Sequence, residues 1–104
     1  MPEKLLRTGF MLLIVGSGVA RADALRDYGK YLAGECTICH RLDGVDAGIP
    51  SIIGMDASAF TTALHRFQAD NLSNAIMVSV ARSLNEKQIA ALASYFSSLR
   101  TERD

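Results

Sequence analysis

Apolar residues recur along this chain at spacings of three and four in several separate segments, which is the pattern of amphipathic helices. The first segment covers residues 25–34, and Asp23 stands where a helix cap is expected. A second begins at Asp56 or Ser58 and runs to about Ala69. The positions predicted to be buried in these two helices are Leu25, Tyr28, Tyr31, Leu32, Phe60, Leu64 and Phe67.

Two further helices are predicted in the second half of the chain. After a turn at residues 70–74, the apolar run at 75–81 has the length of two helical turns. The last helix has the clearest pattern, because Asn85 followed by Gln88 resembles a capping box. Its predicted buried stripe contains Ile89, Leu92, Phe96 and Leu99. No segment alternates with the period of a strand, so we expect one all-α domain of about four helices.

Residues 41–55 lie between the first two predicted helices, and their apolar residues follow neither the helical spacing nor the alternation of a strand. They contain three glycines and a proline, which predicts an ordered loop. Loops of this length in a small domain usually serve a site. Asp43, Asp46 and Asp56 are interpreted as turn and cap residues rather than catalysts, and no catalytic residue is assigned.

The first residues have the layout of a secretory signal, in which two basic residues precede an apolar run at 10–20. Small residues at Ala20 and Ala22 predict cleavage after Ala22, which gives a signal peptide at 1–22 and a mature domain at 23–104. The run is about half of the ~20 residues that cross a bilayer. We therefore expect export to the periplasm and no stable membrane insertion after cleavage.

Charge and size narrow the possible partners. The whole chain has 11 basic and 11 acidic residues, and residues 23–104 keep eight and ten of them. There is no basic stripe, so we expect no nucleic-acid partner. The 82 residues that remain after cleavage are close to the size at which a protein core alone becomes marginal, which favours a large apolar cofactor.

The two cysteines lie in the stretch Cys36-Thr37-Ile38-Cys39-His40, which is the C-x-x-C-H attachment sequence of a c-type haem. Thiols at i and i+3 lie on one side of a helical turn, where each can form a thioether with a haem vinyl group. The histidine that follows is then placed to ligate the iron. We therefore predict one covalently bound haem c on Cys36 and Cys39, with His40 as an iron ligand.

Two other uses of the same residues are possible. A redox pair of the thioredoxin type needs a preceding strand in a βαβ context, and the sequence has no strand pattern. A zinc site needs two further ligands, whereas no other cysteine exists and His65 is the only other histidine. Both alternatives are therefore weaker than haem.

The second axial ligand has several candidates. Met77 is preferred, because it lies 37 residues beyond His40 after a helix that can form a wall of the pocket. Met55, His65 and an open position remain as alternatives, and His65 on a polar helix face is expected to be a surface residue. The backbone carbonyl of Pro50 is predicted to accept a hydrogen bond from the His40 ring, which would fix the tautomer of the ligand.

These residues resemble class I cytochromes c, through Gly29 before C-T-I-C-H, a Pro-x-Ile-x-Gly loop, a methionine and a terminal helix with an aromatic pair. The resemblance implies the small class I fold around one haem. It also implies that the first and last helices cross where Gly29 meets Tyr95 or Phe96. In that family the methionine lies opposite the histidine.

Within this class, residues 49–99 are similar to the cytochrome subunit of flavocytochrome c sulfide dehydrogenases, through P-S-I followed by M-D, and I-M before a short helix. In that family the second methionine, here Met77, ligates the iron. The resemblance implies a separate FAD-containing subunit that oxidises sulfide, and a soluble electron acceptor. This chain would then transfer single electrons without being an enzyme alone. The alternatives are a free-standing electron shuttle and, with an open iron position, a small haem enzyme or gas sensor.

Overall fold

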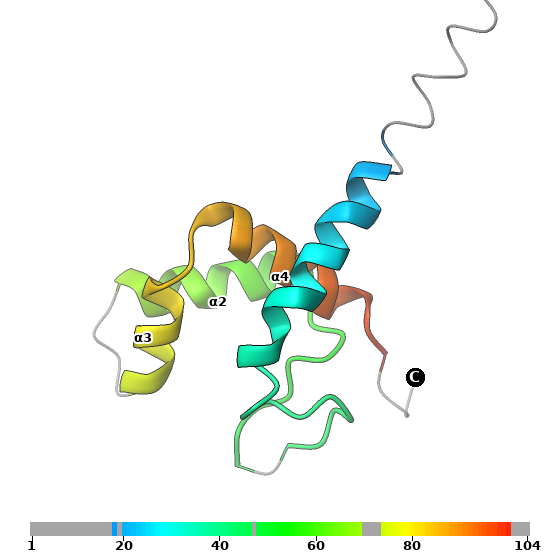
Figure 1. Ribbon diagram of the computed structural model, residues 1–104. Helices are drawn as coiled ribbons and strands as arrows, with labels where there is room; N and C mark the ends of the chain where they lie inside the picture. Colours follow the sequence, from blue (N-terminus) through cyan, green and yellow to red (C-terminus); the bar gives the residue numbers. More distant parts are fainter. Residues whose placement is uncertain (1–17, 19, 47, 70–73, 101–104) are drawn as a thin grey trace, which may run out of the picture.

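The computed structural model of this chain describes residues 18, 20–46, 48–69 and 74–100. All regular structure within these residues is helical, which confirms the all-α prediction and is consistent with a cytochrome c fold (Figure 1). Most of the predicted signal segment and of the turn at 70–74 lies outside the described residues. The elements are a first helix at 20–32, a 3-10 turn η1 (Ala33–Glu35), α2 (Ala57–Ala69), α3 (Ala75–Arg82) and α4 (Glu86–Ser98).

The predicted start of the first helix is wrong. Residues 20–22 are already helical, so Asp23 lies inside the helix rather than at its cap. Its carboxylate accepts a hydrogen bond of 2.8 Å from the guanidinium of Arg26, one turn further on. The physical reason is that Ala and Arg are strong helix formers, so residues 20–22 extend the helix past the apolar pattern.

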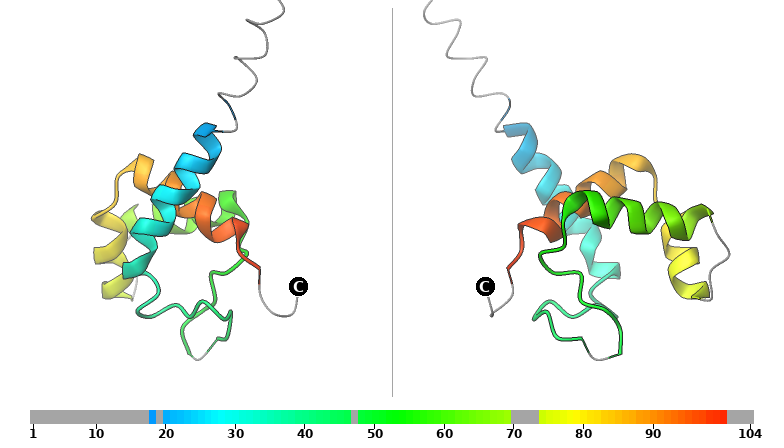
Figure 2. Two further views of the ribbon diagram at one scale, coloured as in Figure 1. Left: turned by 45° about the vertical axis from the view of Figure 1, so that its right-hand side comes forward. Right: turned by 180° about the vertical axis from the view of Figure 1, so that it is seen from behind.

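The first helix crosses α4 at very short distance (Figures 1 and 2). A Cβ atom built on Gly29 would lie 1.9 Å from the carbonyl oxygen of Ala91 and 2.8 Å from the Cβ of Tyr95. The expected crossing of Gly29 with Tyr95 is therefore confirmed. Because small residues form the contact, Gly29 and Ala33 are buried while Tyr31 is 82% exposed, and the prediction that Tyr31 is buried is wrong.

Helix α4 forms the centre of the core. The predicted capping box is confirmed, because the Asn85 side chain accepts from the Gln88 amide and the Gln88 side chain accepts from the Asn85 amide. Phe96 is fully buried and stacks on Phe60 of α2 with ring centroids 5.6 Å apart. Of the predicted stripe, Ile89, Leu92 and Phe96 are buried, whereas Leu99 is half-buried and follows the last helical residue.

In the described part of the chain, no helix combines the length and the apolar character that a bilayer span requires. The apolar run at 10–20 lies almost wholly outside that part.

Candidate functional site

The first helix ends in the turn that bears both cysteines. After η1, the amide of Cys39 donates to the carbonyl of Cys36 at 3.2 Å, and the amide of His40 donates to the same carbonyl at 2.8 Å. One short turn therefore presents both thiols and the imidazole. Among the described residues no disulfide involves either cysteine; Cys36 is half-buried against the core and Cys39 is exposed.

The environment of Cys36 disfavours the charged, thiolate form of its side chain. Burial raises the pKa of the Cys36 thiol, and the negative charge of the neighbouring Glu35 raises it further.

The His40 ring is held by the loop that follows it. Its Nδ1 atom lies 2.6 Å from the carbonyl oxygen of Pro50, so the predicted contact is present. A carbonyl oxygen can only accept, so Nδ1 must be the nitrogen that bears the hydrogen. This tautomer leaves the lone pair of Nε2 for a metal.

Local turns shape the loop between His40 and Pro50. The carboxylate of Asp43 accepts from the amide of Val45 at 2.9 Å and pairs with the guanidinium of Arg41. The Val45 amide, followed by Arg41, lowers the pKa of Asp43. Asp46 accepts from the Gly48 amide at 3.1 Å. Glycine is required at Gly48, where φ is +92°.

The carboxylates of this region thus act as predicted. Asp43 and Asp46 close turns, while Asp56 accepts from the Ala59 amide at 3.1 Å and caps the start of α2. The end of the loop is fixed to the core, because the Gly54 amide donates to the Phe96 carbonyl at 2.9 Å. No sequence pattern indicated this last bond, since it joins two backbone groups far apart in the chain.

The two candidate methionines lie on different elements. Met77 belongs to α3, and its amide donates to the Asn74 side chain that caps this helix. Met55 lies between the loop and α2. Both side chains are half-buried and pack against the core. His65, on α2, instead places Nε2 2.9 Å from a carboxylate oxygen of Glu86 in α4.

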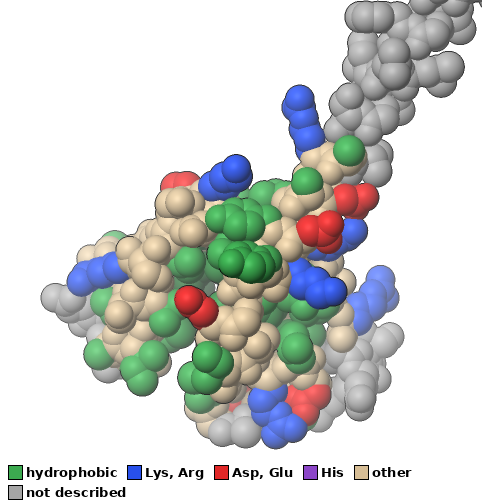
Figure 3. All heavy atoms as spheres, in the orientation of Figure 1, with side chains coloured by type: hydrophobic (Ala, Val, Ile, Leu, Met, Phe, Trp, Pro, Cys, Tyr) green, Lys and Arg blue, Asp and Glu red, His purple; other side chains and the backbone are tan. Residues whose placement is uncertain are grey.

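Much apolar surface remains uncovered around this turn. Ile38, between the two cysteines, is 82% exposed, and Ile76 on α3 is 71% exposed. Figure 3 shows hydrophobic side chains on both sides of a hollow between α3 and the end of the first helix. The half-buried residues packed on the core include Cys36, Ile52, Met55, Phe67, Met77 and Leu84. The cysteines and the oriented imidazole supply the groups that bind a covalently attached haem, and the incompletely covered apolar side chains can pack against it.

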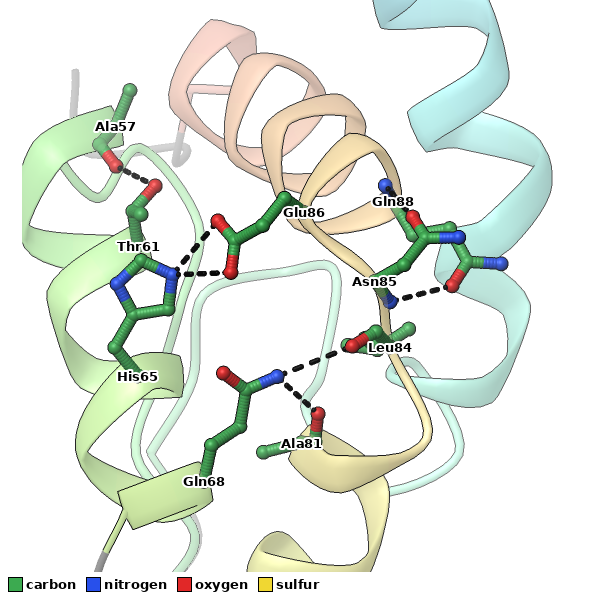
Figure 4. A network of polar contacts seen from close by, with 9 residues as sticks. All are labelled: Ala57, Thr61, His65, Gln68, Ala81, Leu84, Asn85, Glu86 and Gln88. Carbon is green, nitrogen blue, oxygen red and sulfur yellow. Dashed lines mark hydrogen bonds and ion pairs between the residues drawn. The ribbon is translucent and has the colours of Figure 1, made fainter.

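A polar network links α2 to the end of α3 and the start of α4 (Figure 4). The side-chain amide of Gln68 donates to the carbonyls of Ala81 at 2.8 Å and Leu84 at 3.2 Å. The helical pattern missed Gln68, because a polar residue at the end of a helix has no sequence signature for its partner. The sequence does place Gln68 directly after Phe67, at the edge of the buried face of the helix, and this position indicates that its side chain can reach a neighbouring element.

Comparisons with known proteins indicate the class of protein. Over 71 residues, or 65% of this chain, the sequence is 32% identical to the thiosulfate dehydrogenase electron acceptor of Thiomonas intermedia (strain K12) and covers 33% of that protein. Over 90 residues, or 78% of this chain, it is 37% identical to cytochrome c4 of Pseudomonas aeruginosa and covers 45% of it. No protein-family model matches the chain.

These similarities support a class I c-type cytochrome. The geometry of the C-x-x-C-H turn agrees with this class. The chain spans less than half the length of the relatives that it matches.

Proposed function

We propose that this protein is an exported cytochrome with a single haem, attached through Cys36 and Cys39 and ligated by His40 and Met77. The observation that supports it most strongly is the His40 ring, whose Nδ1 atom lies 2.6 Å from the Pro50 carbonyl oxygen, on the turn that also bears Cys36 and Cys39. That bond would make His40 a more basic ligand and fix its orientation.

When bound, haem supplies a one-electron couple between ferric and ferrous iron. The chain would have four tasks. Cys36 and Cys39 would retain the group, and His40 and Met77 would bind its iron. The Pro50 carbonyl would keep the His40 proton on Nδ1, and apolar side chains would exclude water. Because the chain would supply two strong ligands, its residues would need little rearrangement during one-electron transfer. No acid, base or nucleophile is required.

The ligand assignment is tested by the visible spectrum and midpoint potential of the holoprotein. We expect a weak far-red band in the oxidised wild type. Met77→Ala should lose the band and lower the potential, because a thioether ligand favours the ferrous state. Met55→Ala is the matched control and should keep both. Loss of the band in Met55→Ala alone would transfer the ligand role to Met55, and a high-spin wild type that binds carbon monoxide would favour a sensor or small haem enzyme.

We further propose that the electron donor is an enzyme that oxidises reduced sulfur compounds. The family resemblance implies an FAD-containing sulfide dehydrogenase subunit, and one relative is named as the electron acceptor of a thiosulfate dehydrogenase. A free-standing shuttle with transient partners is the alternative. Ile38, Ile49 and Ile76 are all exposed and are available for an apolar contact with the donor and with a soluble acceptor.

Co-purification separates the two possibilities. A permanent subunit should remain bound to a flavin-containing chain from periplasmic extract through gel filtration, because permanent interfaces are large and apolar. A shuttle should elute alone and still accept electrons when the purified enzyme and its sulfur substrate are added. If neither a sulfide dehydrogenase nor a thiosulfate dehydrogenase reduces the protein, a donor that oxidises reduced sulfur compounds is contradicted.

The cellular site is the periplasm in this proposal, with residues 1–22 removed as a signal peptide. Mass spectrometry of the protein from the periplasmic fraction should give an N-terminus at Asp23. A mass that includes residues 1–22 would exclude cleavage.

A further inference from the structure

Helices α2 and α3 are joined by two side chains whose hydrogen bonds run in opposite directions. The Gln68 amide nitrogen, near the end of α2, donates to the carbonyls of Ala81 and Leu84 (Figure 4). In return, the Arg82 Nε donates to the carbonyl of Gln68 at 3.2 Å. The last turn of each helix therefore supplies donors to the other.

This connection matters because α3 has only eight residues. A helix of that length is unstable alone in water, because most of the stability of a short helix comes from packing against other elements. The Ala81 carbonyl already accepts from the Leu84 amide at 3.2 Å, and the part-buried Gln68 side chain adds a donor to it from α2. At the opposite end, the Asn74 side chain accepts from the amide of Met77. The position of α3 thus depends on contacts made from outside the helix.

We infer that Gln68 is a positioning residue that, by holding the last turn of α3 on α2, keeps the Met77 sulfur where it ligates the iron. This inference rests on the proposed function through its assignment of Met77. Without the Gln68 amide, α3 should open more often and leave the sixth position free for an external ligand.

His65 provides a matched control on the same helix. It lies one turn before Gln68, and its ring also makes a polar contact with another helix, at 2.9 Å from Glu86. That contact leads to α4 rather than α3. Loss of His65 should therefore affect stability without affecting the position of Met77.

The experiment compares the holoproteins of wild type, Gln68→Ala, Gln68→Lys and His65→Ala. Imidazole is titrated into the ferric proteins as the far-red band is followed, and hydrogen exchange of the α3 amides is measured separately. In Gln68→Ala we expect imidazole to bind about tenfold more tightly and α3 amides to exchange faster by a similar factor, as for one or two part-buried hydrogen bonds. Gln68→Lys should restore much of both, because an ammonium group donates to helix-end carbonyls.

The outcomes separate the positioning role of Gln68 from the assignment of Met77 as an iron ligand. Unchanged imidazole binding in Gln68→Ala, or an equal change in His65→Ala, would overturn the positioning role, since it would show no effect or only general destabilisation. A wild type without the far-red band would overturn the Met77 assignment and the positioning role with it. Faster exchange of α3 in Gln68→Ala would in that case still show that Gln68 anchors the helix.

Discussion

At Gly29 any side chain would occupy space that the α4 backbone already fills, because a Cβ there would lie 1.9 Å from the Ala91 carbonyl oxygen. The neighbour is backbone, so the two helices must move apart to admit it. Gly29→Ala should lower the free energy of unfolding of the holoprotein by about 1–3 kcal/mol, the usual cost of overpacking. Chemical denaturation measures this change.

Gly34 is the matched control for that substitution. A Cβ atom added at Gly34 would meet no atom of another segment within 4 Å, and its φ is not positive. Gly34→Ala should leave the free energy of unfolding unchanged or raise it by up to about 1 kcal/mol, since alanine restricts the unfolded chain. Equal losses at Gly29 and Gly34 would mean that the helix crossing is not the cause.

The pKa of Asp43 gives a prediction for acid pH. Its folded-state pKa is lowered, first by the Val45 amide and then by Arg41, so ionised Asp43 stabilises the loop. This stabilisation is complete above the ordinary pKa of about 3.9 and is lost as the pH falls through the lower folded-state value. In an NMR titration, the Asp43 carboxyl carbon should have its midpoint below the ordinary value.

Arg41→Ala tests the order of those two causes. The Asp43 midpoint should rise but remain below the ordinary value, because the Val45 amide, which lowers the pKa most, is unchanged. A full return to the ordinary value in Arg41→Ala would show that the ion pair dominates instead.

At the scale of the elements, α4 has the strongest local signals. The capping box of Asn85 and Gln88 is predicted by the sequence and is present. Asn85→Ala should cost about 1 kcal/mol of unfolding free energy, whereas Asn85→Ser should cost little, because serine also accepts from the helix amide. Thermal or denaturant unfolding measures both. Similar losses in the two variants would indicate that packing of Asn85, not capping, is responsible.

The helices were predictable because burial and capping are recorded in local patterns. Phe60, Leu64 and Phe96 follow the helical period, and all three are buried. The errors arose where a distant partner decides the outcome: Tyr31 fits the period of the first helix, yet it is exposed because α4 approaches at Gly29 instead.

In the candidate site, too, local features were predictable from the sequence and contacts between distant segments were not. The spacing of Cys36, Cys39 and His40 is local, and the structure brings the three together on one turn. The Pro50 contact was predictable because the ring of a metal-ligating histidine needs an acceptor for its second nitrogen. The bonds from Gln68 to Ala81 and Leu84 were not, because they depend on how α2 and α3 are arranged in space.

At the scale of the whole molecule, the buried core is small and many apolar side chains are only half-covered. A covalently bound haem would cover part of them. The Cys36→Ser, Cys39→Ser double variant, which cannot retain haem covalently, should therefore unfold at lower temperature and with less cooperativity than the holoprotein, and should bind a hydrophobic dye. Calorimetry and dye fluorescence measure these changes. An unfolding transition identical to that of the holoprotein would contradict a structural role for the cofactor.

The contact of Gly29 with Ala91 joins positions about sixty residues apart. Such a contact cannot form until nearly all of the chain has been synthesised, and contacts between distant positions delay folding. The first helix and the cysteine turn must therefore remain without their final partner until the last helix arrives. If the exported chain crosses the membrane before it folds, its cysteines are accessible for haem attachment during this interval. A chain truncated before α4 would remain exposed to proteases.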